Sequence, residues 1–177
     1  MPKSGNRRHI NWQNLRNPKG ALAIFIATAA GAGLGPIAPG TWGSLVALPL
    51  IWYTDSQPLL LKIILWILVF GIGTWSAKVV GETSGVSDNQ NIVIDEVVGM
   101  GITAIAFHGS WQTLVVAFVV FRIFDMIKLP PIRQIDTWSK NVTSHWVGGF
   151  GVMIDDVLAG FQGFLVIALL QRLSLLS

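Results

Sequence analysis

Five of the nine acidic residues lie in or beside long apolar segments, where charge is uncommon. They are Asp95, Glu96, Asp125, Asp155 and Asp156. Charged groups beside apolar spans are costly to bury, and those that occur there usually serve a function. The chain has no cysteine and only three scattered histidines, so its carboxylates would favour a hard, oxygen-preferring cation such as Mg²⁺. These residues predict a carboxylate metal site.

Basic and glycine-rich residues near these acids are candidates for holding phosphate. Arg122, Lys128 and Arg133 flank Asp125 in the sequence, and guanidinium and ammonium groups bind phosphate oxygens. Lys128 or Arg133 could instead be a positive residue that extends to a membrane surface. The stretch 31–43, GAGLGPIAPGTWG, could cradle phosphate with its backbone N–H groups and the Thr41 hydroxyl, or could simply separate two helices.

The composition favours a membrane protein. Of 177 residues, 52% are hydrophobic and 12% are charged, against roughly 25% charged in soluble domains. This excludes a disordered chain, a collagen and a disulfide scaffold. Residues 1–19 form a basic arm with five Lys or Arg residues and no acid. Beside so apolar a chain, the arm favours contact with anionic lipid rather than with nucleic acid.

The apolar segments have helical lengths, so we expect an all-α, multi-pass membrane protein. About five long apolar helices are expected, with a short N-terminal helix that is re-entrant or lies at the interface. After the arm, residues 20–177 are expected to form one domain. The predicted apolar segments are 20–30, 44–53, 59–80, 92–107, 111–127 and 155–176, with a mixed loop and at most a short helix over 129–154.

The order of these segments predicts that the acids meet on one face. The turn at 108–110 reverses the chain, so Asp125 returns to the level of Asp95 and Glu96. The loop 129–154 lacks an apolar span, so Asp155 and Asp156 should open the last helix on that same face. The same alternation of helix directions places Thr41 on that face. Positive residues in the arm and in the loop make this face cytoplasmic.

Simpler interpretations exist for each acidic site. Asp155 and Asp156 could cap a helix N-terminus, and Asp125 could pair with Arg122 or Lys128 within one helix. An ion transporter or channel is a further alternative, but it would carry polar residues at several depths rather than at one end. A membrane interaction protein without catalytic activity would explain the basic arm but not the convergent carboxylates.

Four blocks in order, GLGPIAPGTWGSL, NIVIDEVVGM, FRIFDMIKLPPIR and GGFGVMIDDVLAG, resemble the phosphatidylglycerophosphatase A family. The resemblance implies a helical enzyme of the bacterial inner membrane, a phosphoric monoester hydrolase. Such an enzyme hydrolyses phosphatidylglycerophosphate to phosphatidylglycerol and inorganic phosphate with Mg²⁺. A phosphatase of another glycerophospholipid or of a polyprenyl phosphate is the alternative.

The resemblance places the family's acidic and FRxFDxxK-type blocks on the acidic and basic residues named above. The reaction implied by the family then suggests a role for each of them. We expect Asp95, Glu96, Asp125 and Asp156 to be metal ligands, directly or through water. Asp155 would be a further ligand or a general base, and Lys128 and Arg122 would offset charge on the phosphoryl oxygens. The residues expected to contact the phosphate or glycerol are Gly35, Pro39, Gly40, Thr41 and Arg133.

Overall fold

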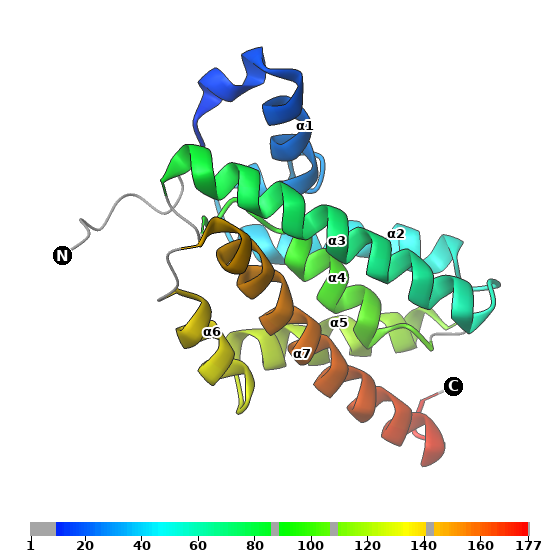
Figure 1. Cartoon of the computed structure of the whole chain (residues 1–177). Helices are drawn as coiled ribbons and strands as arrows, with labels where there is room; N and C mark the ends of the chain where they lie inside the picture. Colours follow the sequence, from blue (N-terminus) through cyan, green and yellow to red (C-terminus); the bar gives the residue numbers. More distant parts are fainter. Residues whose placement is uncertain (1–9, 86–88, 107–109, 141–143, 177) are drawn as a thin grey trace.

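The computed structural model describes residues 10–85, 89–106, 110–140 and 144–176, and the secondary structure in these ranges is helical. This confirms the all-α prediction for the described part of the chain. The helices are α1 (Pro18–Ala27), α2 (Pro39–Tyr53), α3 (Leu59–Ser84), α4 (Ile94–Thr103), α5 (Trp111–Ile127), α6 (Ile132–Lys140) and α7 (His145–Arg172), with short 3-10 segments at Trp12–Arg16 and Ala32–Leu34 (Figure 1).

Helix α4 lies at the centre of the bundle and contacts α2, α3, α5 and α7. It is shorter than the predicted segment 92–107, because the residues before it pair with another part of the chain. The Val93 N–H donates to the Ala27 carbonyl at 2.8 Å, and the Asn91 side-chain amide donates to the Gly33 carbonyl at 2.9 Å. The helix therefore begins at Ile94, and Asp95 and Glu96 fall in its first turn, where the helix dipole favours negative charge.

Helices α3 and α7 are long and apolar enough to cross a membrane. Only 22% of the most apolar window of α3 and 39% of that of α7 are buried inside the protein, whereas the core helix of a soluble protein is mostly buried. Large apolar side chains instead face outward, including Leu60, Ile67, Leu165 and Leu169. These two helices support a membrane location. The predicted count of about five long apolar helices stays a prediction.

The prediction that Asp155 opens the last helix is wrong. Helix α7 begins at His145, so Asp155 and Asp156 lie in its interior and do not cap it. The glycines of segment 148–151 predict a loop, but in the structure they allow α7 to pack closely on α3. A side chain at Gly149 would come within 2.8 Å of the Thr74 carbonyl oxygen and 2.9 Å of the Lys78 amide nitrogen. The short helix expected between residues 129 and 154 is present as α6, and α7 also begins within that segment.

Close contact between α4 and α7 brings distant acidic residues together. A side chain at Gly160 would overlap the Gly99 carbonyl, so the two backbones touch there. The Thr103 hydroxyl donates to the carbonyls of Gly99, at 3.0 Å, and Gly160, at 3.2 Å. Asp95 precedes Gly99 by four residues and Asp156 precedes Gly160 by four. Residues four apart share a helix face, so the contact that joins the glycines also aims both carboxylates at one point.

Candidate metal and phosphate site

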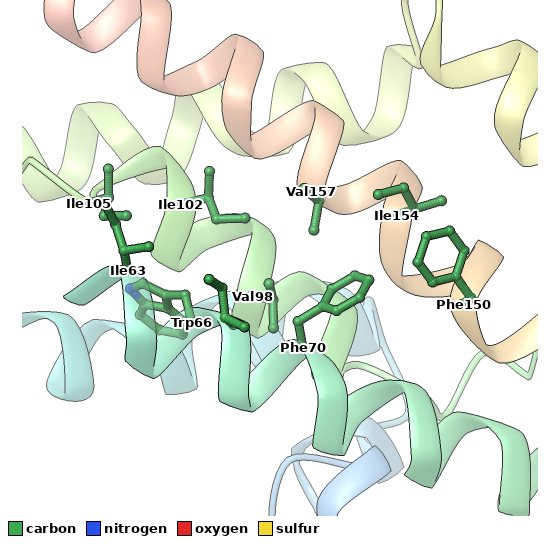
Figure 2. A pocket seen from close by; sticks show the side chains of 10 residues that line it. Ile63, Trp66, Phe70, Val98, Ile102, Ile105, Phe150, Ile154 and Val157 are labelled. Atoms are coloured by element: carbon green, nitrogen blue, oxygen red, sulfur yellow. The ribbon is translucent and has the colours of Figure 1, made fainter. Parts of the chain in front are cut away.

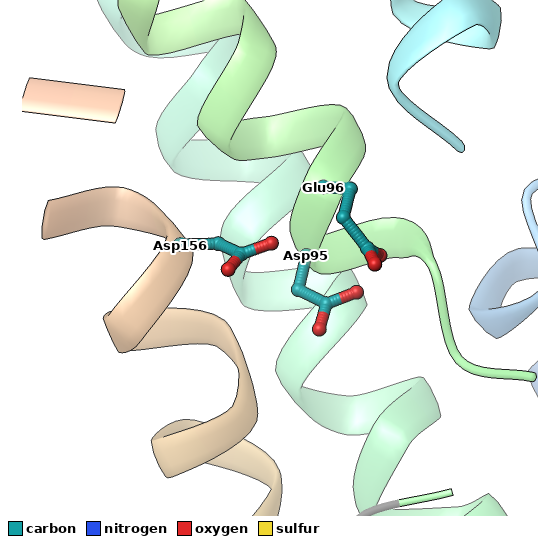
Figure 3. Close-up of side chains that lie close together, drawn as sticks. All are labelled: Asp95, Glu96 and Asp156. Carbon is teal, nitrogen blue, oxygen red and sulfur yellow. The ribbon is translucent and has the colours of Figure 1, made fainter. Parts of the chain in front are cut away.

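Three carboxylates meet where α4 and α7 cross. Asp95, Glu96 and Asp156 each offer one oxygen, and these three oxygens lie within 4.8 Å of one another. Figure 3 shows the Asp156 side chain extending from α7 towards the two acids of α4. The predicted convergence is therefore found for three of the five acids in this group. This spacing and donor chemistry fit a divalent cation with oxygen ligands.

The environment of these carboxylates adds a reason for a cation. One oxygen of each is buried without a hydrogen-bond partner in the described part of the chain, namely Asp95 Oδ1, Glu96 Oε2 and Asp156 Oδ2. Burial raises the pKa of Asp95 well above its ordinary value, and the charges of Glu96 and Asp156 raise it further. Burial also raises the pKa of Glu96 to about 7. A bound cation would compensate this crowded negative charge.

Two ion pairs flank the carboxylates. The Arg122 Nη1 atom lies 2.6 Å from Asp125 Oδ2 within α5, and the Lys128 Nζ atom lies 2.6 Å from Asp155 Oδ2 on α7. The first pair is the intrahelical contact considered above, and it leaves Asp125 outside the group of three. Asp125 is nevertheless close enough to raise the pKa of Glu96 through its charge. Lys128 pairs across helices because it ends α5 in a left-handed conformation, with φ of 48°.

The glycine- and proline-rich stretch reaches the same place, as the order of segments predicts. Pro39 begins α2, and Gly40 and Thr41 complete its first turn, so the helix starts earlier than the predicted segment 44–53. A side chain at Gly40 would overlap the Glu96 carboxylate and come within 3.1 Å of Arg122 Nη1. The N-termini of α2 and α4 therefore both lie at the site, and their N–H groups carry partial positive charge that attracts anions.

For two expected phosphate contacts, Gly35 and Arg133, no described contact leads to this group. Gly35 packs against the Trp42 ring: a Cβ atom added at Gly35 would lie 2.9 Å from Trp42 Cδ1. Arg133 lies in α6 with an exposed side chain, and none of its described contacts reaches the three carboxylates. Their roles stay predictions. The residues 1–9 of the basic arm lie outside the described residues, as do His108 and the His145 side chain.

The sequence interpretation missed Gly99 and Gly160 as residues that position the site. Both stand in helices rather than at turns. The available signal was their spacing, since each follows an acidic residue by four positions. Small residues at such positions allow close approach of helices in a membrane.

Comparison with known proteins now adds to this geometry. The family model described as phosphatidylglycerophosphatase A matches residues 25–171. The chain is 42% identical over 137 residues to phosphatidylglycerophosphatase A of Escherichia coli strain K12, covering 77% of this chain and 76% of that protein. It is 37% identical over 160 residues to the protein of the same name from Haemophilus influenzae, covering 89% of this chain and 91% of that one.

A third relative carries a different name. A Bacteroides thetaiotaomicron protein provisionally named phosphatidylinositol-3-phosphatase is 36% identical over 156 residues, covering 83% of this chain and 92% of that protein. No solved structure matches the chain.

Proposed function

The chain belongs to the phosphatidylglycerophosphatase A family, and from this premise we propose that it hydrolyses phosphatidylglycerophosphate to phosphatidylglycerol and inorganic phosphate. The observation that carries the proposal is the meeting of three carboxylate oxygens within 4.8 Å. Beside them lie two ion pairs and the N-termini of α2 and α4. Such a place combines cation ligands with groups that attract a phosphate anion.

The cation in this proposal is Mg²⁺. Asp95, Glu96 and Asp156 would hold it, and Asp125 would contribute through water, since Mg²⁺ usually keeps several of its waters. When bound, the ion supplies positive charge that lets a phosphate dianion approach the carboxylates, polarises a phosphoryl oxygen and lowers the pKa of a bound water.

The remaining residues at the site position and stabilise the phosphate. Arg122 and Lys128 would offset negative charge on the phosphoryl oxygens as it develops. Their partners Asp125 and Asp155, each at 2.6 Å, fix where these cations lie. Asp155 would accept the proton of the attacking water, with Lys128 holding its carboxylate in place.

The first turn of α2 would complete the phosphate site. Gly40 lies against Glu96 and Arg122, so the absence of a side chain there lets this turn lie directly beside a proposed cation ligand and a proposed phosphate contact. Pro39 starts the helix, and Thr41 adds a hydroxyl in the same turn. The phosphate would therefore meet backbone N–H groups on one side and the cationic side chains on the other.

A direct test is phosphate release by the purified, full-length protein. We expect release from phosphatidylglycerophosphate in the presence of Mg²⁺ and loss of that release when EDTA removes the metal. Phosphatidylinositol 3-phosphate is the second substrate to test, because the Bacteroides relative carries that substrate in its name. Faster release from this lipid would replace the first proposal by the second, and no release from either would contradict both.

We also propose that the protein crosses the bacterial inner membrane several times, with the site on the cytoplasmic face. Two apolar helices support a membrane location. They run antiparallel, since Gly149 packs beside Lys78 while Met153 packs beside Gly73. The basic residues Arg16 and Lys19 precede α1 or lie in its first turn, and positive charge near a helix end favours the cytoplasm.

The orientation can be tested by labelling single cysteines, because the chain has none of its own. Helix α5 runs from Trp111 to Ile127 and ends beside Lys128, at the site. We expect a thiol reagent confined to the cytoplasm to modify Ser144→Cys, at the start of α7, but not Ser110→Cys, at the opposite end of α5. The reverse labelling pattern would place the site on the other face.

A further inference from the structure

A groove between α3, α4 and α7 has an apolar lining and a volume of about 360 Å³. Figure 2 shows its side chains extending from Phe150 and Ile154 at one end to Ile63 and Ile105 at the other. Trp66 forms part of its wall and is only 4% exposed. The Trp66 ring lies so close to α4 that a side chain at Gly101 would overlap it. The groove is therefore built by tight packing beneath it.

One wall of the groove leads towards Asp95 along α4. On α4, the lining residues Val98 and Ile102 follow Asp95 by three and seven positions, so all three share one helix face. On α7, the lining residues Ile154 and Val157 share one face, and Asp155 and Asp156 between them point to the other side of the helix. At about 1.5 Å per residue, the α4 face extends the groove roughly 10 Å away from the carboxylates.

The outer side of the groove meets the surface that would face lipid. Its wall residue Ile67 is 63% exposed, and it belongs to the outward face of a candidate membrane span. Phe150 is also exposed and packs edge-on against Phe70 at 5.6 Å between ring centroids. A chain lying in the bilayer could therefore enter from the side without crossing a polar layer.

We infer that this groove binds one acyl chain of the lipid substrate while the phosphate occupies the carboxylate site. This inference rests on the proposed function, because the head group fixes where the tail begins. The α4 face that Asp95 shares with the lining residues Val98 and Ile102 supports an acyl chain. A helix of a partner protein, about 10 Å in diameter, would exceed 360 Å³ within a single turn.

Blocking the groove should slow hydrolysis of a lipid with long acyl chains and leave hydrolysis of a short-chain lipid nearly unchanged. We expect Ile67→Trp and Ile102→Trp to lower kcat/KM for dioleoyl phosphatidylglycerophosphate by about tenfold, the size of effect that small changes in an apolar pocket produce. Release from the dihexanoyl lipid should change less than about twofold, because its chains are too short to fill the groove. Ile72→Trp is the matched control: Ile72 is exposed on the same helix and lies outside the groove lining.

Equal losses on both substrates, or the same loss in Ile72→Trp, would overturn the groove proposal. Crosslinking supplies a readout that does not depend on activity. A phosphatidylglycerophosphate with a diazirine on its acyl chain should label α3, α4 and α7 peptides at the groove, and Ile67→Trp should reduce that labelling. Equal labelling of the outward face of α5 would show a chain in bulk lipid and overturn the proposal. Inactive wild-type protein with specific groove labelling would instead contradict only the proposed reaction.

Discussion

Asp156→Asn is expected to lower Mg²⁺-dependent phosphate release by more than 100-fold. Loss of a group that only supports a metal ligand already costs roughly 10–100-fold, and Asp156 offers an oxygen within 4.8 Å of those of Asp95 and Glu96. The side chain is 4% exposed, so water cannot readily replace it. Asparagine keeps the shape of the side chain but removes the charge that holds a cation.

Thermal unfolding separates this interpretation from a general loss of structure. Wild-type protein should unfold at a higher temperature when Mg²⁺ is added, because a ligand that binds only the folded state stabilises it. Asp156→Asn should lose most of that increase. Without Mg²⁺, the variant should unfold at the same temperature as wild type or higher, since it no longer buries this charge beside two other carboxylates.

Two further variants sharpen the comparison. Asp125→Asn should lower the rate while keeping the Mg²⁺-dependent increase in unfolding temperature, because Asp125 pairs with Arg122 at 2.6 Å and lies outside the group of three. Glu82→Gln removes an exposed carboxylate of α3 that pairs with Lys78, and it should change neither readout. Near-normal activity of Asp156→Asn would contradict the assignment of the metal site.

The convergence of the acids could be predicted because successive apolar helices joined by short turns alternate in direction, so the number of helices between two acids gives the face on which each lies. A turn between two apolar helices returns Asp125 towards Asp95 whatever the details of packing, and in the structure α4 contacts α5 and Asp125 is close enough to raise the pKa of Glu96. The same count brought the glycine- and proline-rich stretch to the site, and Gly40 does lie against Glu96. Predictions of this kind need only the lengths and order of the segments.

The start of α7 could not be found by the same counting. Glycines at 148, 149 and 151 lower helix propensity, so the sequence predicts a loop there. The helix forms because Gly149 allows close contact with the α3 backbone at Thr74 and Lys78, and such contact stabilises a membrane helix more than propensity does. The Arg122–Asp125 pair follows from its spacing within one helix, but the partner of Lys128 could not be predicted. Lys128 shares a helix face with Asp125 in the sequence pattern, yet its left-handed backbone directs it to Asp155.

The contact between α4 and α7 gives the second large expected effect. Gly160→Ala adds a methyl group that would overlap the Gly99 carbonyl, and backbone cannot move aside as a flexible side chain would. We expect the free energy of unfolding to fall by about 3 kcal/mol, at the upper end of the cost of overpacking. Phosphate release should fall by about 100-fold, since a displacement of roughly 1 Å in a catalytic group can have that effect.

A glycine-to-alanine substitution where there is open space should raise the free energy of unfolding instead of lowering it. Gly71 lies in α3 with nothing within 4 Å of the position a side chain would take, so Gly71→Ala should stabilise the helix by about 0.5–1 kcal/mol through reduced backbone freedom. Unfolding in detergent measures both variants, and Mg²⁺-dependent stabilisation reports on the carboxylates. If Gly160→Ala loses stability but keeps full Mg²⁺ affinity, close contact at Gly160 does not position Asp156. If it loses both while Gly71→Ala keeps both, the spacing of four residues between acid and glycine is what joins helix packing to the site.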